Sequence, residues 1–326
     1  MRDGTPSATW SGIVTVVMTL LGWSSVPLFL RYFADANLDG WTSNGWRYGF
    51  SALLWAPLVL VLVARRRMPA GIWRAALIPG VINASGQVCF TFAHYHIDPG
   101  LVTFGLRTQL VFVAIGAYAL FPLERAVIRT PGYLTGLVLV AVGTAATIGM
   151  GDAASGAINA TGVVLAVLAG LGFASYGMSV RRCMSGFHPV VAFSVICQYT
   201  AIPMIGLMLI FGDRAGLSAF DLGPAGIGWL LLSAVIGIAL GHVFYYLAIE
   251  RLGVAVSSGV VQLQPFLTTL GSMRLFGEVL VAAQWFGGVA ALLGAILMLA
   301  TQHVVSRRSA SRSTSESGDS DDMMPG

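Results

Sequence analysis

Two arginines stand inside long apolar runs of this sequence, where a charged side chain is costly. Arg47 lies in the run 41–63 and Arg107 in the run 99–121. Placing an arginine in hydrocarbon costs about 2.5 kcal/mol or more, so such a residue normally faces a partner or a water-filled cavity. Either guanidinium could therefore attract an anionic group of a ligand. Either could instead hydrogen-bond the backbone carbonyls of a neighbouring helix or extend toward the membrane surface.

A stripe of polar side chains marks another apolar run. Asn83, Gln87 and His94 follow one another at spacings of four and seven residues, which places them on one face of a helix. Because lipid cannot satisfy an amide group, we expect this face to line a cavity. Gln198 occupies the position that corresponds to Arg47 in an internal repeat of the chain. For Asn83 and Gln198, hydrogen bonding between helices is an equally good interpretation.

The same repeat adds aromatic and histidine candidates. His242 corresponds to Gln87 and is followed by Tyr245, and Trp23 corresponds to Phe173. We expect Gln87 and His242 to face each other across a central cavity. Aromatic side chains near a helix centre suit the apolar wall of such a cavity, although core packing alone would also account for Trp23.

Two pairs of polar residues compete for the cavity face. Arg107 and Gln109 are two residues apart, as are Gln262 and Gln264, so each pair spans about 200° of a helix. At most one member of a pair can point inward, unless Pro265 distorts its helix. We choose Arg107 in the first pair and leave the second open. The repeat position of Pro265 is a valine, so we expect this hinge to be asymmetric.

The elements that position these residues follow from composition. The chain has 326 residues, of which 56% are hydrophobic and only 10% charged. Soluble domains carry about 25% charged residues, so nearly all of this chain belongs in lipid. A spanning helix needs roughly 20 apolar residues. Ten runs qualify, at about 10–30, 41–63, 74–95, 99–121, 131–149, 161–180, 189–212, 226–248, 253–276 and 282–302.

The two halves of the chain repeat each other. Residues 21–26 recur with changes at 171–176, and residues 86–88 recur at 241–243. Five spans in each half is an odd number, so the two copies must run in opposite directions, as in many secondary transporters. The predicted organisation is a cytoplasmic N-terminus at 1–9, a five-helix repeat at 10–151, a loop at 152–160, an inverted five-helix repeat at 161–302 and a disordered cytoplasmic tail at 303–326.

The distribution of arginine sets the expected orientation. All 18 basic residues are arginine, and the net charge is +4. With a cytoplasmic N-terminus, only Arg31 and Arg214 fall in outside loops, and the positive-inside rule favours this arrangement. The basic balance thus reflects topology in a cell (inner) membrane and does not imply nucleic acid. The inside loops would collect Arg2, Arg65, Arg66, Arg67, Arg74, Arg125, Arg129, Arg181, Arg182, Arg251, Arg307, Arg308 and Arg312.

Two glutamates close apolar runs, at the ends of the fourth and ninth predicted spans. Glu278 follows Arg274 by four residues, and Glu124 precedes Arg125, so we expect each carboxylate to be neutralised within its own segment. Both glutamates are therefore interpreted as structural.

Titratable groups near the membrane centre are few. No Asp or Glu lies near the middle of a predicted span, where a carboxylate proton relay would be expected. Proton coupling would then depend on His242, or on His94 near the outer surface. The three cysteines are isolated, so neither a disulfide nor a metal site is predicted, and no cofactor is expected. The absence of a Walker A sequence excludes direct ATP hydrolysis.

Several short motifs, in this order and spacing, resemble the drug/metabolite transporter superfamily, and the EamA type in particular. They are found at 46–48, 122–125, 245–248, 264–265 and 276–278. The resemblance covers about residues 10–302 and implies ten helices in two EamA-like repeats. It also implies a structural role for Arg47, since the family carries arginine there with very different substrates. The chain departs from the family at the fourth span, which lacks the usual proline and carries Arg107. We therefore favour substrate contact for Arg107.

The predicted function is export or exchange of a small zwitterionic or anionic metabolite, such as an amino acid, by alternating access. The alternative is a multidrug-type exporter of lipophilic or cationic compounds, which buried arginines without a buried carboxylate disfavour. A membrane enzyme or sensor is a weaker alternative, since the sequence offers no paired carboxylates, metal-ligand cluster or nucleophile elbow. The expected partners are a small-molecule substrate, the lipid bilayer and, through His242, protons.

Overall fold

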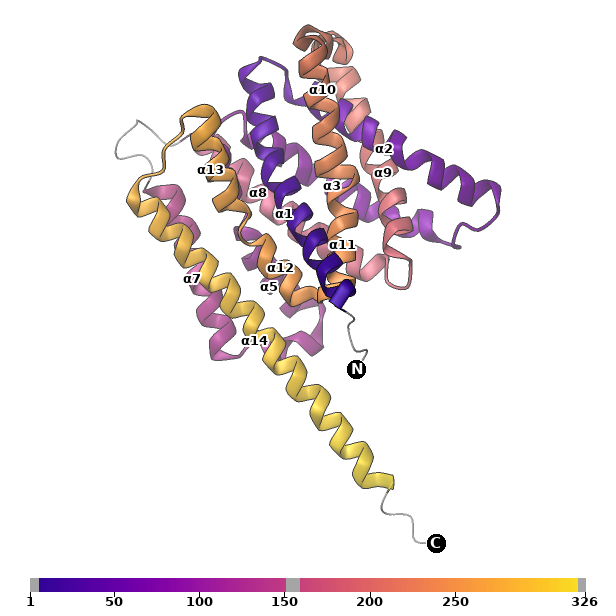
Figure 1. The fold of residues 1–326 in the computed structure, drawn as a ribbon, viewed down its shortest axis with the longest axis vertical. Helices are drawn as coiled ribbons and strands as arrows, with labels where there is room; N and C mark the ends of the chain where they lie inside the picture. Colours follow the sequence, from indigo (N-terminus) through magenta and orange to yellow (C-terminus); the bar gives the residue numbers. More distant parts are fainter. Residues whose placement is uncertain (1–5, 151–158, 322–326) are drawn as a thin grey trace.

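The computed structural model describes residues 6–150 and 159–321, without side-chain placement at 6–9, 123, 254–255 and 306–321. Every element in these ranges is a helix (Figure 1). In the first half they are α1 (Pro6–Asp35), α2 (Gly40–Ala64), α3 (Ile72–Ala93), α4 (Pro99–Gly105), α5 (Thr108–Leu120), η1 (Pro122–Glu124), α6 (Arg125–Ile128) and α7 (Pro131–Gly149). In the second half they are α8 (Ala160–Cys183), α9 (Pro189–Phe211), η2 (Asp213–Leu222), α10 (Gly223–Ser233), η3 (Ala234–Ala239), α11 (Gly241–Leu252), α12 (Val254–Val261), α13 (Gln264–Phe276) and α14 (Ala282–Asp321).

The outer surface of the bundle is apolar. Large hydrophobic side chains such as Leu60, Ile202 and Phe286 are exposed by 66%, 66% and 77%. Soluble proteins rarely expose contiguous apolar surface on this scale, whereas lipid tails accept it. Nine helical stretches of the described residues are long and apolar enough to cross a membrane. The chain is therefore a multi-pass membrane protein.

The predicted run 253–276 does not form one continuous helix. It is divided into α12, of 8 residues, and α13, of 13 residues, each too short to span a bilayer alone. Pro265 has no N–H to donate to the carbonyl of Val261. At the break, the N–H of Leu263 bonds Val260 O at 3.0 Å, the tighter spacing of a 3₁₀ turn.

The fourth predicted span is broken at the corresponding place, so the expected asymmetry of the hinge is wrong. The run 99–121 is divided into α4, of 7 residues, and α5, of 13 residues, with Leu106 and Arg107 between them. No proline stands here. Instead, the hydroxyl of Thr108 donates to Gly105 O at 2.7 Å, a local bond that competes with the regular helical ladder.

Helices α7 and α14 lie side by side and pack closely through glycines (Figure 1). A Cβ added at Gly136 would lie 2.6 Å from the carbonyl oxygen of Gly294, and one at Gly143 would lie 2.5 Å from that of Gly287. Small residues let two helix backbones approach within a membrane. Gly136 and Gly143 therefore pack α7 against α14 within one protomer.

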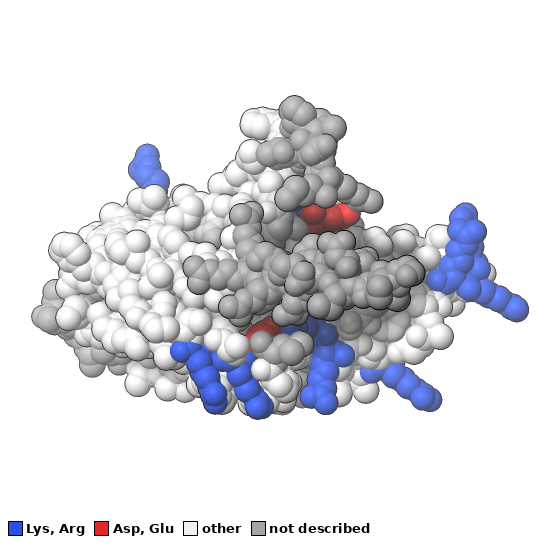
Figure 2. Space-filling model, turned by 90° about the horizontal axis from the view of Figure 1, so that it is seen from below, with Lys and Arg blue, Asp and Glu red and all other residues white. Residues whose placement is uncertain are grey.

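Exposed arginines gather at one end of the bundle. Figure 2 views the molecule from below and shows blue side chains projecting around its rim, with few red ones. The exposed arginines in the loops and helix ends predicted to lie inside are Arg65, Arg66, Arg67, Arg74, Arg125, Arg129, Arg181, Arg182 and Arg251.

Two predicted boundaries meet the limits of the described chain. Most of the loop predicted at 152–160 lies outside the described residues. Helix α14 extends to Asp321, beyond residue 302, where we placed the end of the last span. Disorder after residue 302 stays a prediction, based on a serine- and arginine-rich sequence that has no apolar face to bury.

Candidate functional site

The site is centred on Arg107, which lies at the break between α4 and α5. Its Nη1 donates to Oε1 of Gln262 at 2.5 Å, and its Nη2 donates to Oε1 of Gln264 at 3.1 Å. Its Nε is buried and has no hydrogen-bond partner in the described part of the chain. The guanidinium therefore holds two neutral amide oxygens and retains an unsatisfied donor.

Both glutamines face Arg107, although at most one of them would do so on a regular helix. They flank the break, with Gln262 after the end of α12 and Gln264 at the start of α13. The tight turn between them brings the two side chains to the same side. The helix is distorted next to Pro265, as the sequence analysis allowed. Both glutamines therefore reach Arg107, and no choice between them is needed.

A proline in α1 connects this group to Trp23. Pro27 cannot donate to the carbonyl oxygen of Trp23, four residues earlier in its helix. That oxygen instead accepts a bond from Nε2 of Gln264 at 3.0 Å. One turn along α13, the hydroxyl of Thr268 donates to Ser24 O at 2.9 Å. Polar side chains of α13 thus hold the kinked part of α1.

Aromatic rings form the next part of the site. The ring of Trp23 lies 5.4 Å from that of His242 and 5.1 Å from that of Tyr245. Phe193 stacks on His242 at 4.5 Å with an interplanar angle of 15°. The hydroxyl of Tyr245 shares a hydrogen bond of 2.9 Å with Ser258 on α12. The structure therefore brings together Trp23, Arg107, His242, Tyr245, Gln262 and Gln264.

A small hollow lies beside the guanidinium, on the side that faces α14. It is lined by Arg107 and Gln262 together with Phe104, Pro265, Phe266 and Gly288. A Cβ at Gly288 would lie 2.6 Å from the ring of Phe104, so only glycine leaves room there. The hollow places a charged group among apolar walls, and in this conformation it has no room for a water molecule.

Three predicted site residues lie in a separate group and bond between helices. Nε of Arg47 donates to the hydroxyl of Ser233 at 3.0 Å, and Nδ2 of Asn83 donates to that of Thr200 at 3.1 Å. Nε2 of Gln198 donates to the carbonyl oxygen of residue 52 at 2.9 Å. These bonds join α2 to α10 and to α9, and α3 to α9. They favour the structural interpretation that we left open for these residues.

Gln87 stands apart from both groups. It is half-buried on α3 and makes no hydrogen bond with the described residues. Its neighbour Gly86 packs on α8, where an added Cβ would lie 3.4 Å from the backbone of Gly172. That Gln87 and His242 face each other across a cavity stays a prediction.

Sequence reasoning missed several partners of these residues. Phe193, Ser233 and Ser258 were not candidates, because nothing in their spacing sets them apart from ordinary span residues. It also missed the π-helical segment η3, in which the N–H of Leu240 bonds Val235 O, five residues back, at 2.8 Å. Such bulges often occur at functional sites. This one directly precedes the helix that carries His242.

The glutamates do not pair within their own segments, so that expectation is wrong for both. Glu278 lies 3.8 Å from Nε of Arg31 on α1, and Glu124 pairs with Arg181 on α8. Helix packing brings these arginines closer than the sequence neighbours Arg274 and Arg125. Both carboxylates therefore connect different helices.

The described helices thus form an apolar bundle with a buried polar cluster around Arg107. The model of the EamA-like transporter family matches residues 160–300. This match agrees with the resemblance recognised in the motifs and covers the part of the chain that contains Gln264 and Glu278.

A solved protein crystal structure supports the fold. It covers 93% of this chain and 98% of its own, with 18% sequence identity and a TM-score of 0.57. No curated protein matches the chain in sequence. At this level of identity the likeness concerns the fold alone.

Proposed function

We propose that this protein is a secondary transporter of the cell (inner) membrane that exports or exchanges a small zwitterionic or anionic metabolite, such as an amino acid. The observation that carries the proposal is Arg107, whose two acceptors are both uncharged. An arginine kept in a membrane span without a carboxylate partner is suited to receive one from a substrate. The glutamine oxygens hold the guanidinium while no substrate is bound.

Alternating access would use the two broken spans. Half-helices joined by a short turn can change their mutual angle without unfolding, and transporter sites are commonly built from such discontinuous helices. Arg107 and Gln262 lie directly at the two breaks. A substrate that draws Arg107 away from the glutamines would therefore act on both hinges at once.

Helix packing supports ten spans in two inverted repeats. Helix α1 packs on α11, and α8 packs on α3, which is the same pairing with the halves exchanged. Helices α2 with α9, and α7 with α14, pair corresponding spans of the two halves. We take α12 and α13 together as the ninth span, which brings the total to ten with α14 as the last. The distribution of exposed arginines supports cytoplasmic termini.

A proton-coupled mechanism would depend on His242, which is in contact with the aromatic part of the site. Its Nδ1 lies 3.2 Å from Ile238 O, so the other ring nitrogen would exchange the proton. We retain protons as a possible partner on this ground.

The second candidate is a multidrug-type exporter of lipophilic cations. The cluster of Trp23, Phe193 and Tyr245 favours it, because aromatic faces bind cations. Arg107 opposes it, since a buried positive charge repels a cationic substrate. A membrane enzyme or sensor has no comparable observation in its favour.

The test is transport by the purified protein in proteoliposomes against a panel of amino acids, organic anions and permanently cationic dyes. The proposal requires saturable transport of a zwitterion or an anion. Transport confined to the cationic dyes would select the second candidate.

A further inference from the structure

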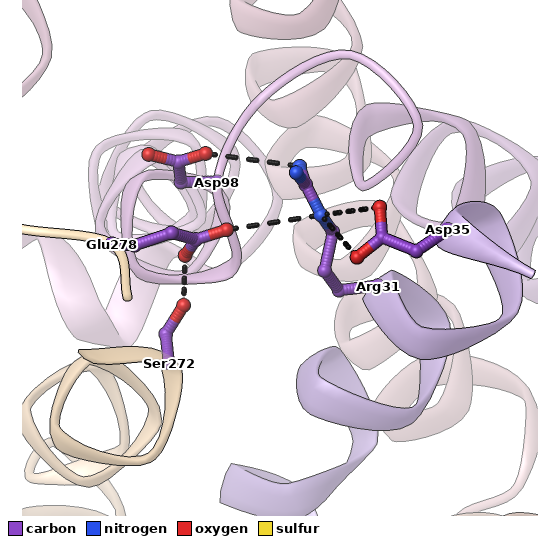
Figure 3. A network of polar contacts seen from close by, with 5 residues as sticks. All are labelled: Arg31, Asp35, Asp98, Ser272 and Glu278. Carbon is purple, nitrogen blue, oxygen red and sulfur yellow. Dashed lines mark hydrogen bonds and ion pairs between the residues drawn. The ribbon is translucent and has the colours of Figure 1, made fainter. Parts of the chain in front are cut away.

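A cluster of charged side chains closes one end of the bundle, away from the site described above. Arg31, near the end of α1, is surrounded by three carboxylates (Figure 3). Its Nε lies 3.0 Å from Asp35, on the same helix, and 3.8 Å from Glu278, whereas its Nη1 lies 3.7 Å from Asp98. Arg31 is therefore hydrogen-bonded mainly by Asp35. With all four groups ionised, the cluster has a net charge of −2.

Glu278 is the most enclosed of these carboxylates. Its side chain is 13% exposed, against 47% for Asp98 and 49% for Asp35. The hydroxyl of Ser272 donates to its Oε2, and its Oε1 is buried without a hydrogen-bond donor among the described residues. Arg274, the charged residue of α13 that lies four residues before Glu278, is exposed and forms no ion pair with the described chain. The negative charge of Glu278 is therefore stabilised by few hydrogen bonds or ion pairs.

A small hollow joins Glu278 to Asp98. It is lined by both carboxylates and by Thr269, whose side chain is buried to 98%. The hydroxyl oxygen of Thr269 has no hydrogen-bond partner in the described part of the chain. A buried hydroxyl without a partner costs free energy unless a ligand or a water uses it. The hollow therefore has polar groups that are free to bond a ligand or a water molecule.

Burial raises the pKa of Glu278 to about 8, and the negative charges of Asp98 and Asp35 act in the same direction. Arg31 opposes the rise in this pKa but does not cancel it. Since the pKa is raised, the proton is bound below about pH 8 and lost above it. A carboxyl group that is enclosed and lies near other negative charges keeps its proton to higher pH.

We propose that Glu278, which lines one hollow with Asp98, binds a proton there and that this proton keeps this end of the transporter closed. The pair connects the start of α4 to the segment after α13, and Arg31 connects both to α1. Without the proton, three carboxylates face one arginine, and their repulsion separates these elements. A metal ion would bind here less favourably than a proton, because the positive Arg31 lies among the carboxylates.

The inference rests on the proposed function only in that closure of this end belongs to a transport cycle. In the topology given above, this end faces outward, so the proton would come from the outside. The half-helices α4 and α13 lead from the cluster directly to Arg107 and Gln264. Opening this end would therefore give a path to the substrate site.

The test measures solvent access to the hollow in the full-length protein, without substrate. The native residues Cys89, Cys183 and Cys197 are replaced, and Leu101→Cys places a single thiol in the wall of the hollow. Its rate of labelling by a membrane-impermeant maleimide is divided by that of Leu217→Cys, which is 57% exposed in η2, does not line the hollow and corrects for the ionisation of the thiol itself.

For a pKa of about 8, the charged fraction of Glu278 rises from about 10% at pH 7 to about 90% at pH 9. We expect the labelling ratio to rise up to about ninefold over this range. Glu278→Gln carries no charge and should keep the ratio low at every pH. Asp98→Asn removes the neighbouring charge and should shift the midpoint to lower pH.

The matched control is Glu124→Gln, which changes the corresponding glutamate of the first repeat at the other end of the bundle. It should leave the midpoint as in the wild type. A ratio that does not change with pH, or the same midpoint in Glu278→Gln and Asp98→Asn as in the wild type, would overturn the inference. Because no substrate is present, either result leaves the transport proposal standing, and a failure to find a substrate leaves this one standing.

Discussion

Replacing Arg107 by lysine is the most direct test of the proposed substrate contact. The guanidinium uses two terminal nitrogens, at 2.5 and 3.1 Å from separate oxygens. The two oxygens of a carboxylate could take the same two donors. A lysine keeps the charge but presents it as a single point without the planar fork. The variant should therefore lose one of the two hydrogen bonds to the substrate.

The size of the effect follows from the strength of such a bond. A hydrogen bond to a charged group contributes about 1.5–3 kcal/mol. Its loss should raise KM roughly 10- to 150-fold, since about 1.4 kcal/mol corresponds to a factor of ten. Arg107→Gln removes the charge as well and should impair transport at least as much. Both variants should be present in the membrane at the wild-type amount.

The assay is uptake of the anionic or zwitterionic substrate into proteoliposomes at several substrate concentrations, together with thermal unfolding of the same preparation. Gln109→Ala is the matched control and should leave KM unchanged, because the side-chain bonds of Arg107 go to Gln262 and Gln264 and not to Gln109. If both Arg107 variants transport with the wild-type KM, the substrate assignment is refuted. A lowered melting temperature with unchanged KM would show that the arginine serves only to hold the glutamines.

Three further predictions concern topology and packing. Cysteine labelling should find Arg66→Cys accessible only from the inside and Asp213→Cys only from the outside, and the reverse pattern would contradict the inverted repeat. Gly143→Ala should lower the melting temperature, because the new methyl would lie 2.5 Å from backbone atoms of α14, whereas Gly149→Ala, with no atom within 4 Å, should not. Asn83→Ala should destabilise the protein by about 0.6–2 kcal/mol in reversible unfolding and leave KM unchanged, and a changed KM instead would return Asn83 to the substrate site.

The sequence by itself determined the class of the protein. Low charge and long apolar runs are sufficient to predict a multi-pass helical bundle, because a helix satisfies its own backbone hydrogen bonds in lipid and each run is long enough to span it as a helix. The motifs around Arg47, Glu124 and Glu278 resemble the EamA type, and the family model matches the part of the chain that contains Glu278, residues 160–300.

The candidate site could be predicted in part. Arg107, Gln262 and Gln264 were chosen because a polar group in lipid needs a partner, and the structure makes them partners of one another. The same argument selected Arg47, Asn83 and Gln198, whose partners are instead neighbouring helices. A single sequence shows that a polar residue needs a partner without showing which one it has.

Tertiary structure alone decided the partners and the backbone breaks. Glu278 has Arg274 four residues away in sequence, yet packing of α1 brings Arg31 to it. The break at Leu106 and Arg107 has no proline to announce it, since it arises from a local hydrogen bond of Thr108 and from the contact with Gln262. Periodicity records which face of a helix is polar. Only the packing of helices distant in the sequence decides what that face meets, because the contact free energy depends on both surfaces at once.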